Sequence, residues 1–241
     1  MAQNYSNVQH IVVDGASTDG TLDILRSFPH LTWTSEKDSG QADALNKALA
    51  LATGDVIGWI NSDDYYCENI FGSVIQHFHR TNADWLVGNL SLVFEDDTAT
   101  DFRASPVVTR QALMRYPDIV RQQSTFFRRT FINTAGGWDK QYFMAMDFDL
   151  WMRLSAKQPP QMVNESWAYF RVHGDQKSAG QHLLRQSREI GRILRREHAP
   201  YRFILRHRLL KRWFWIKGLA KRRMIDAGLL SERYRSRPVR L

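Results

Sequence analysis

The stretch from Asp55 to Tyr66 constrains the fold more than any other part of the chain. It begins with an apolar run, Val56 to Ile60, which is long enough for a buried strand and too short for a helix. The run is followed by two adjacent carboxylates, Asp63 and Asp64. Because two acids at the tip of a buried strand repel each other, a cation should lie between them and solvent. A hard divalent ion fits that requirement and would also bind a diphosphate, whereas the plainer alternative is a solvated Asn-Ser-Asp-Asp turn.

Strand patterns and helix patterns alternate around this stretch. Residues 8–13 and 31–34 read as strands, and each is followed by a polar turn and then by apolar residues at helical spacing, over 22–28 and 42–52. This alternation predicts an α/β fold with a parallel or mixed sheet. In such sheets ligands bind beyond the carboxyl ends of the strands. Four acids fall at such ends: Asp14, Asp38, Asp63 and Asp64.

The rest of the chain continues the same pattern up to about residue 178. Apolar spacing and turn residues predict helices over 68–80, 109–116 and 146–154, strands over 84–94 and 163–172, and a hairpin turn over 95–98. Residues 1–178 are therefore expected to form one domain and residues 179–241 a helical tail. At 241 residues the chain is long enough for a sizeable core.

Charge is divided unevenly between these two parts. Residues 1–176 hold 14 Lys and Arg against 21 Asp and Glu, whereas residues 177–241 hold 19 against 4. The lone Cys67 suits a reducing compartment, and neither a signal peptide nor an apolar run of about 18 residues is visible. We therefore expect a cytoplasmic protein whose basic tail contacts an anionic surface.

Three motifs in register resemble the family 2 glycosyltransferases of the GT-A fold. They cover residues 12–21, 36–47 and 61–64, and the similarity extends over roughly residues 5 to 178. The resemblance implies a Rossmann-like mixed sheet flanked by helices and a nucleotide-sugar donor, with uridine favoured. It places Asp14 and Asp38 at the nucleoside and makes Asp63 a metal ligand with Asp64 beside it. Asn61 stands where the family often has Asp. A turn-forming role is the alternative for Asp14.

The same resemblance assigns roles to residues of the second half. Gln123 lies near the acceptor, and the Gly136-Gly137 loop lies against the donor sugar, although paired glycines also form ordinary turns. Asp147 takes the acceptor proton, with Met146 where the family usually has Glu. Asp149 lies beside it on the acceptor side, as a support for the loop or helix. The alternative for both acids is a favourable place at the positive end of a helix.

His173 follows the last expected strand, at the place where a histidine completes the family's metal shell. A lone histidine is otherwise a surface or packing residue. Neutral imidazole suits Mn²⁺ better than Mg²⁺, and one of these two ions is the expected cofactor.

The tail contains a segment that is both basic and aromatic. Residues 201–225 hold nine Lys and Arg and no acid, interleaved with apolar residues that include Trp213 and Trp215. Such a segment, within 199–225, can lie in a lipid headgroup interface on the inner face of the plasma membrane. Packing against the catalytic body is the alternative. Nucleic acid is not an expected partner, because the sequence contains no groove-reading motif.

The family normally has one more strand and helix before the segment that matches Tyr5. We therefore expect an open sheet that lacks an inner strand, with apolar edges exposed. The expected function is metal-dependent, inverting transfer of a sugar from a UDP-sugar to a glycan or lipid-linked acceptor in surface polysaccharide biosynthesis. The alternative is an impaired fragment that binds a membrane or a partner.

Overall fold

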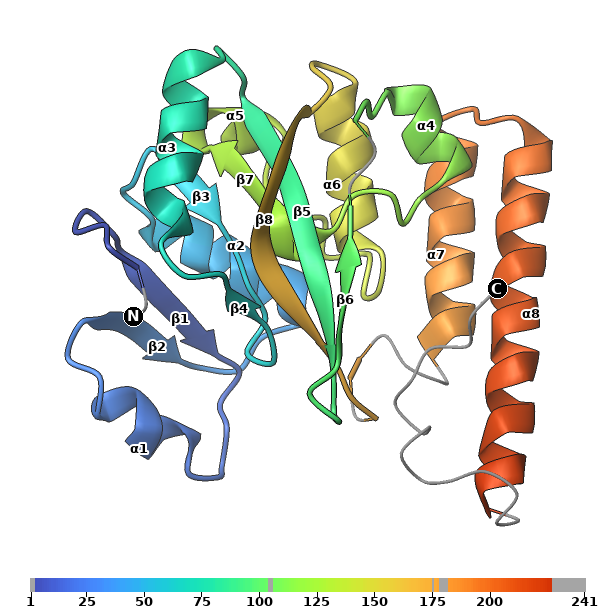
Figure 1. Ribbon diagram of the computed structural model, residues 1–241, viewed down its shortest axis with the longest axis horizontal. Helices are drawn as coiled ribbons and strands as arrows, with labels where there is room; N and C mark the ends of the chain where they lie inside the picture. The colour runs from blue at the N-terminus through green and yellow to red at the C-terminus, as the bar shows by residue number, and fades with distance from the viewer. Residues whose placement is uncertain (1–2, 104–105, 175, 178–181, 227–241) are drawn as a thin grey trace.

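The chain folds around a mixed sheet that lies between two layers of helices (Figure 1). The computed structural model describes residues 3–103, 106–174, 176–177 and 182–226. Neighbouring strands in this sheet run in the order β3, β7, β5, β8, β4, and β6 pairs with β5. β5 and β8 are parallel, and the other pairs are antiparallel. The expected mixed α/β architecture is confirmed. The strands are β3 (Val56–Gly58), β4 (Tyr65–Tyr66), β5 (Trp85–Phe94), β6 (Ala99–Phe102), β7 (Thr125–Arg128) and β8 (Gln161–Val172).

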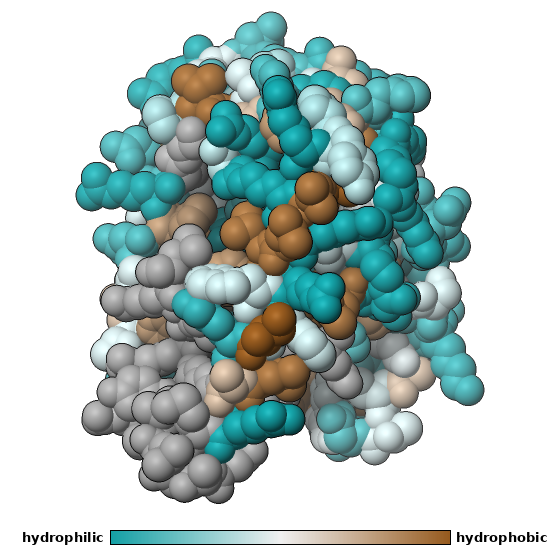
Figure 2. Space-filling model, turned by 90° about the vertical axis from the view of Figure 1, so that its right-hand side faces the viewer, coloured by the Kyte–Doolittle hydropathy of each residue, from teal (hydrophilic) through white to brown (hydrophobic). Residues whose placement is uncertain are grey.

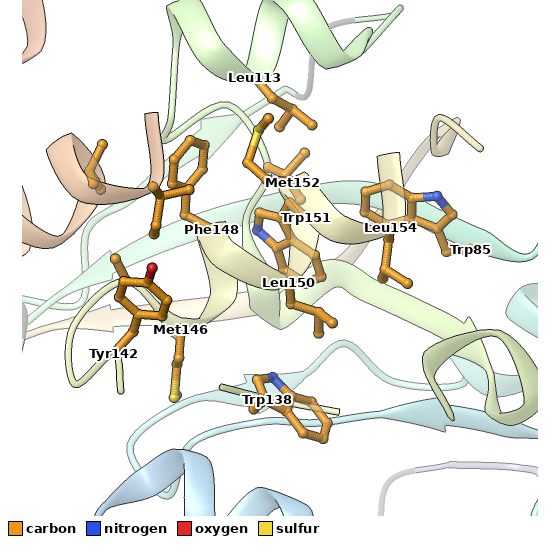
Figure 3. Packing of buried hydrophobic residues seen from close by; sticks show 14 of the residues in the cluster. Trp85, Leu113, Trp138, Tyr142, Met146, Phe148, Leu150, Trp151, Met152 and Leu154 are labelled. Carbon is orange, nitrogen blue, oxygen red and sulfur yellow. The ribbon is translucent and has the colours of Figure 1, made fainter. Parts of the chain in front are cut away.

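A hydrophobic core covers each face of this sheet. Side chains alternate along a strand. Trp85 of β5 and Phe127 of β7 therefore face α6 (Met146–Ser155), where their rings stack on Trp151 at 5.6 and 5.5 Å (Figure 3). Leu86 and Phe126, one position along, face α3 (Ile70–Arg80) on the other side.

The first two strands form a separate sheet. β1 (His10–Asp14) and β2 (Leu31–Ser35) are parallel to each other, are connected through α1 (Thr21–Arg26), and share no hydrogen-bonded pairing with the large sheet. α2 (Gln41–Leu51) packs against β1. The expected opening in the sheet thus lies between β1 and β3. As a result β3 is only partly buried, with Gly58 exposed, although its sequence predicts a buried strand.

A cleft of about 2,830 Å³ occupies this opening. Apolar side chains of β1, β3 and α2 line one part of it, and the loops that follow the strands line the other. The cleft therefore joins the exposed sheet edges to Asp63, Asp64 and Asp147, whereas Asp14 and Asp38 lie outside its lining.

α7 (Leu183–Arg196) and α8 (Tyr201–Asp226) close the molecule on the side away from β1 and β2 (Figure 1). α7 contributes Ile190, Ile193 and Leu194 to the same core as Trp85, so the expected boundary at residue 178 does not divide the hydrophobic core. α8 packs along α7. Among the described residues, none of the helices combines the length and apolar content needed to cross a bilayer. The other helical segments are α4 (Arg110–Arg115), the 3₁₀ turn η1 (Gln122–Ser124) and α5 (Arg129–Thr134).

Candidate active site

The turn after β3 holds its two acids in different environments. The Asp64 amide donates to the Asn61 carbonyl at 3.1 Å, which closes the turn. The Asp64 carboxylate is buried and accepts hydrogen bonds from Gln123 Nε2 at 2.9 Å, the Arg171 amide at 3.0 Å and Asn61 Nδ2 at 3.2 Å. Burial raises the pKa of Asp64 to about 6. Asp64 therefore fixes the turn, and its contact with the metal stays a prediction.

Asp63, by contrast, is partly exposed and lies beside His173. The Asp63 Oδ2 and His173 Nε2 atoms are 3.1 Å apart, although the residues are 110 positions apart in the chain. His173 directly follows β8, and Asp63 lies between β3 and β4. The side chains are 33% and 29% exposed and both line the cleft. The folded sheet thus brings together two of the three residues predicted to hold the metal.

These two side chains fit an open site for a divalent ion. A carboxylate oxygen and an imidazole nitrogen are a donor pair that Mn²⁺ accepts. Two protein ligands leave several coordination positions for diphosphate oxygens and water. The described residues contain no group of three or more His, Cys, Asp or Glu side chains that could enclose an ion.

A chain of hydrogen bonds connects this turn to Lys177, a residue to which the sequence analysis gave no role. Lys177 Nζ donates to Gln41 Oε1 at 3.0 Å, and Gln41 Nε2 donates to Asn61 Oδ1 at 2.7 Å. The ammonium group also lies 4.0 Å from the centre of the Phe143 ring. Burial lowers the pKa of Lys177. A lysine in the lining of the cleft places positive charge where a diphosphate would bind.

The acids after β1 and β2 lie in adjacent loops. Asp14 is buried and accepts hydrogen bonds from the Ser17 amide, the Ser17 hydroxyl and the Ser35 hydroxyl, at 2.9, 2.5 and 2.6 Å. These hydrogen bonds lower the pKa of Asp14. Asp38 accepts from the Gly40 amide at 2.8 Å and lies against Gly15, where a Cβ atom would be 3.0 Å from its carboxylate. The contacts of Asp14 fit the turn-forming alternative, and nucleoside contact by Asp38 stays a prediction.

Asp147 lies in the first turn of α6, on the wall of the cleft that also contains Asp63 and His173. Its carboxylate accepts a hydrogen bond from the Phe148 amide at 2.7 Å. Burial raises the pKa of Asp147 to about 6, and the nearby charge of Asp118 acts in the same direction. A half-buried carboxylate with such a pKa can accept a proton near neutral pH.

Asp149 is held by two arginines in the interior of the protein. It is fully buried, and its two oxygens accept hydrogen bonds from Arg153 Nε at 2.8 Å and Arg196 Nη1 at 2.6 Å. Because a helix turns by about 100° per residue, Asp149 faces away from Asp147 and into the contact with α7. These contacts fit a support of the neighbouring loop, and they give no support to a place on the acceptor side.

The glycine loop likewise lies outside the cleft. Arg153, held by Asp149, donates to the carbonyls of Ala135 and Gly137 and so fixes this loop from behind. Gly136 and Gly137 have φ of +74° and +72° and end α5. Gly137 lies against Asn46 of α2, so the contact predicted between these glycines and a donor sugar is not supported by their position.

Next to Asp147 the cleft is lined by polar groups that sequence reasoning overlooked. Both amide atoms of Gln122 and the Nε atom of Arg121 are buried without a hydrogen-bond partner among the described residues. Gln123, predicted near the acceptor, lines the same wall, but its amide nitrogen is used by Asp64. Buried polar groups without partners are rare in folded proteins, so Gln122 is a candidate for substrate contact. The family motif drew attention to Gln123. Apart from that motif, nothing in the sequence distinguishes Gln122 from Gln123.

Comparison with solved structures supports the same fold. The TarS protein of S. aureus, solved with UDP-GlcNAc, superimposes with a TM-score of 0.64 and 17% identity over 80% of this chain and 58% of that chain. The mannosyltransferase PcManGT of Pyrobaculum calidifontis, solved with GDP-Man and Mn²⁺, superimposes with a TM-score of 0.58 and 19% identity. This match covers 96% of this chain and 69% of that chain. At these identities the likeness shows the fold, and it confirms the expected GT-A architecture.

Sequence comparison identifies the family. The Escherichia coli protein UDP-Glc:alpha-D-GlcNAc-diphosphoundecaprenol beta-1,3-glucosyltransferase WfaP is 27% identical over 229 residues, which are 92% of this chain and 86% of that protein. Chondroitin synthase of Escherichia coli is 25% identical over 183 residues, but this chain matches only 26% of its length. Residues 1–152 match the sequence profile of glycosyl transferase family 2. The chain therefore belongs to glycosyl transferase family 2 and is a glycosyltransferase.

Proposed function

We propose that the chain transfers a sugar, with inversion, from a UDP-sugar to a hydroxyl group of a glycan or lipid-linked acceptor in surface polysaccharide biosynthesis. One observation carries this proposal: Asp63 and His173 lie 3.1 Å apart in the same cleft as Asp147. A metal-binding pair and a base in one cleft are what a single displacement at an anomeric carbon needs.

The arrangement supports a mechanism in one step. Asp147 accepts the proton of the acceptor hydroxyl, whose oxygen forms a bond to the anomeric carbon of the donor. The bond between that carbon and the diphosphate oxygen breaks, and the diphosphate leaves with the bonding electrons. Asp63 and His173 are the residues that would hold Mn²⁺ or Mg²⁺, which supplies positive charge for the leaving diphosphate. Lys177 adds a fixed charge in the same cleft.

The identity of the donor is inferred from the relatives. WfaP is named for UDP-Glc, and TarS was solved with UDP-GlcNAc, whereas PcManGT was solved with GDP-Man. We favour a uridine nucleotide, with Asp38 as the acid that contacts the nucleoside. The WfaP name also describes a diphosphoundecaprenol acceptor, and a lipid-linked acceptor would suit a peripheral position of this chain at a membrane through residues 199–225.

Nucleotide binding tests the proposal. UDP should bind to the chain in the presence of Mn²⁺ and more weakly in its absence, as measured by titration calorimetry. Asp63→Asn should abolish the effect of Mn²⁺, because an amide brings no charge to a divalent ion. Asp23→Asn, the same change on an 82% exposed side chain of α1, is the matched control and should bind like the wild type.

The same titration decides between enzyme and fragment. The opening between β1 and β3 lies beside the donor region, which favours an impaired, binding-only role as the second candidate. If UDP fails to bind with or without Mn²⁺, the catalytic proposal is wrong and the second candidate stands. If Asp63→Asn binds UDP with undiminished dependence on Mn²⁺, Asp63 is not a metal ligand.

A further inference from the structure

The helix α8 has two apolar faces on opposite sides. Its inner face buries Phe203, Ile204 and His207 in the contact with the rest of the protein. A second set of apolar side chains points outward: Leu205, Leu209, Trp213 and Ile216 are 43%, 58%, 37% and 51% exposed. Their spacing of four, four and three residues places them in one row along the helix. A surface helix that packs only against its own domain needs a single apolar face. The outer row is therefore suited to contact with a partner.

Basic side chains border this outer row. At 100° per residue, Arg212 lies on one side of the row and Lys217 lies on the other. Lys217 Nζ is 3.6 Å from the centre of the Trp213 ring, at the edge of the row. Residues 201–225 contain no acid. Figure 2 shows the result on the face that carries α8, where hydrophobic side chains run between hydrophilic ones.

We propose that this outer face of α8 binds the surface of a bilayer that contains anionic lipids. An apolar row would enter the boundary between headgroups and acyl chains, and the flanking cations would contact lipid phosphates. Each basic residue close to an anionic surface strengthens this attraction, which salt weakens. Tryptophan beside a lysine suits such a boundary, because the ring sits at headgroup level while the long side chain reaches the phosphates. A protein groove would accept the apolar row but gives no reason for cations on both borders.

The inner side of the same helix holds the loop that leads to the candidate active site. Lys211 Nζ pairs with Asp118 at 2.9 Å, and Arg206 Nη1 donates to the Arg115 carbonyl at 3.2 Å. Burial alone would raise the pKa of Asp118, but the charges of Lys211 and Arg121 lower it to about 2. The Asp118 carboxylate is therefore ionised at neutral pH and can pair with the Lys211 ammonium. From Asp118 the chain runs directly to Arg121 and Gln122 in the cleft.

One helix therefore connects the proposed membrane surface to the wall of the cleft. An acceptor carried by a lipid would be presented at the level of the bilayer, and the loop at residues 115–121 lies between that surface and Asp147. This inference rests on the proposed function for its biological meaning, since it names the surface on which that function would take place. Binding to the bilayer can nevertheless be measured without any sugar transfer.

The experiment uses the full chain and vesicles of two compositions, phosphatidylcholine alone and phosphatidylcholine mixed with phosphatidylglycerol. The chain should cosediment with the mixed vesicles, less so as salt rises, and its tryptophan emission should shift to the blue. The double variant Leu209→Glu, Ile216→Glu should bind at least about 10-fold more weakly, since it removes two apolar contacts and adds two repulsive charges. Ile24→Glu, the same kind of change at a 61% exposed position of α1, is the control and should bind normally.

Two results would overturn the proposal: equal binding to both kinds of vesicle, or unchanged binding of the double variant. Tighter binding to duplex DNA than to mixed vesicles, lost in the same variant, would assign the surface to nucleic acid instead. Circular dichroism establishes that each variant is folded. UDP titration of the same samples separates the two proposals, because vesicle binding without nucleotide binding supports the membrane surface and contradicts the enzymatic function.

Discussion

Asp147 is the residue on which the proposed chemistry depends most. Asp147→Asn keeps the size and the polar character of the side chain but removes its ability to accept a proton. We expect sugar transfer to fall by about 10²-fold or more, the usual scale for a lost general base. The affinity for UDP with Mn²⁺ should stay unchanged. If affinity falls while turnover holds, Asp147 is a binding residue and the assignment is wrong.

The pH dependence of the wild-type enzyme provides a second readout of the same assignment. The active form of Asp147 is the carboxylate, and burial raises its pKa to about 6. Activity should therefore be full above that pH and fall by about 10-fold for each pH unit well below it. In the Asn variant the residual rate should lose this dependence. An acid limb that persists unchanged in the variant would show that another group titrates.

Asp63 and Asp64 show how much of the candidate site can be predicted from residues that are close together in the sequence. Both acids were predicted as metal ligands because both follow the same strand. Their separate environments come from Gln123, Arg171 and His173, which lie 59 to 110 positions away and are brought close by the pairing of β5, β7 and β8. A pattern within one stretch predicts that acids gather at a strand end. It does not say which of two neighbours is buried.

Among the elements, the loop between α5 and α6 allows a prediction about stability. Gly136 and Gly137 have nearly the same positive φ, but their surroundings differ. A Cβ atom on Gly136 meets nothing within 4 Å, whereas one on Gly137 would clash with Asn46 Oδ1. The two glycines thus form a matched pair in which one variable, the close approach of α2, is changed.

Both Gly136→Ala and Gly137→Ala should lower the free energy of unfolding by about 1 kcal/mol, because alanine is strained in the left-handed region. Gly137→Ala should lower the free energy of unfolding further, because its Cβ atom would displace Asn46. Asn46 Oδ1 accepts from the Trp138 amide at 2.9 Å, and Asn46 Nδ2 donates to the Trp138 carbonyl at 2.7 Å. Urea unfolding of the two variants measures the difference. Equal destabilisation would show that Asn46 moves aside freely.

This loop also explains where element-level prediction succeeded and where it failed. Long segments with clear apolar spacing, such as α2, α3 and β5, lie close to their predicted positions. α5 and β4 were not predicted, since six residues and two residues are too few for a period to be read. The glycines were assigned to the donor by the family motif. Their actual position depends on Arg153 and Asn46, which bind the loop from outside the cleft.

At the scale of the whole molecule, the division of the sheet is the dominant feature. Two-stranded sheets are marginally stable by themselves, and β1 and β2 gain their main support from α2. β5 and β8, by contrast, pair along most of their length between two cores. The sequence predicted an open sheet from a family pattern. It could not show that the opening would merge with the candidate active site in one cleft.

Native-state hydrogen exchange should resolve this division. Amides of β1 and β2 should exchange much earlier than those of β5 and β8, because local opening of the small sheet exposes few buried contacts. UDP with Mn²⁺ should then slow exchange in β1 and β2, because a ligand that binds only the folded form stabilises what it touches, and the Asp38 loop follows β2 directly. Exchange in α7, on the far side of the core, should not change. Equal protection of β1 and β5 in the ligand-free chain would mean that the two sheets act as one unit in solution.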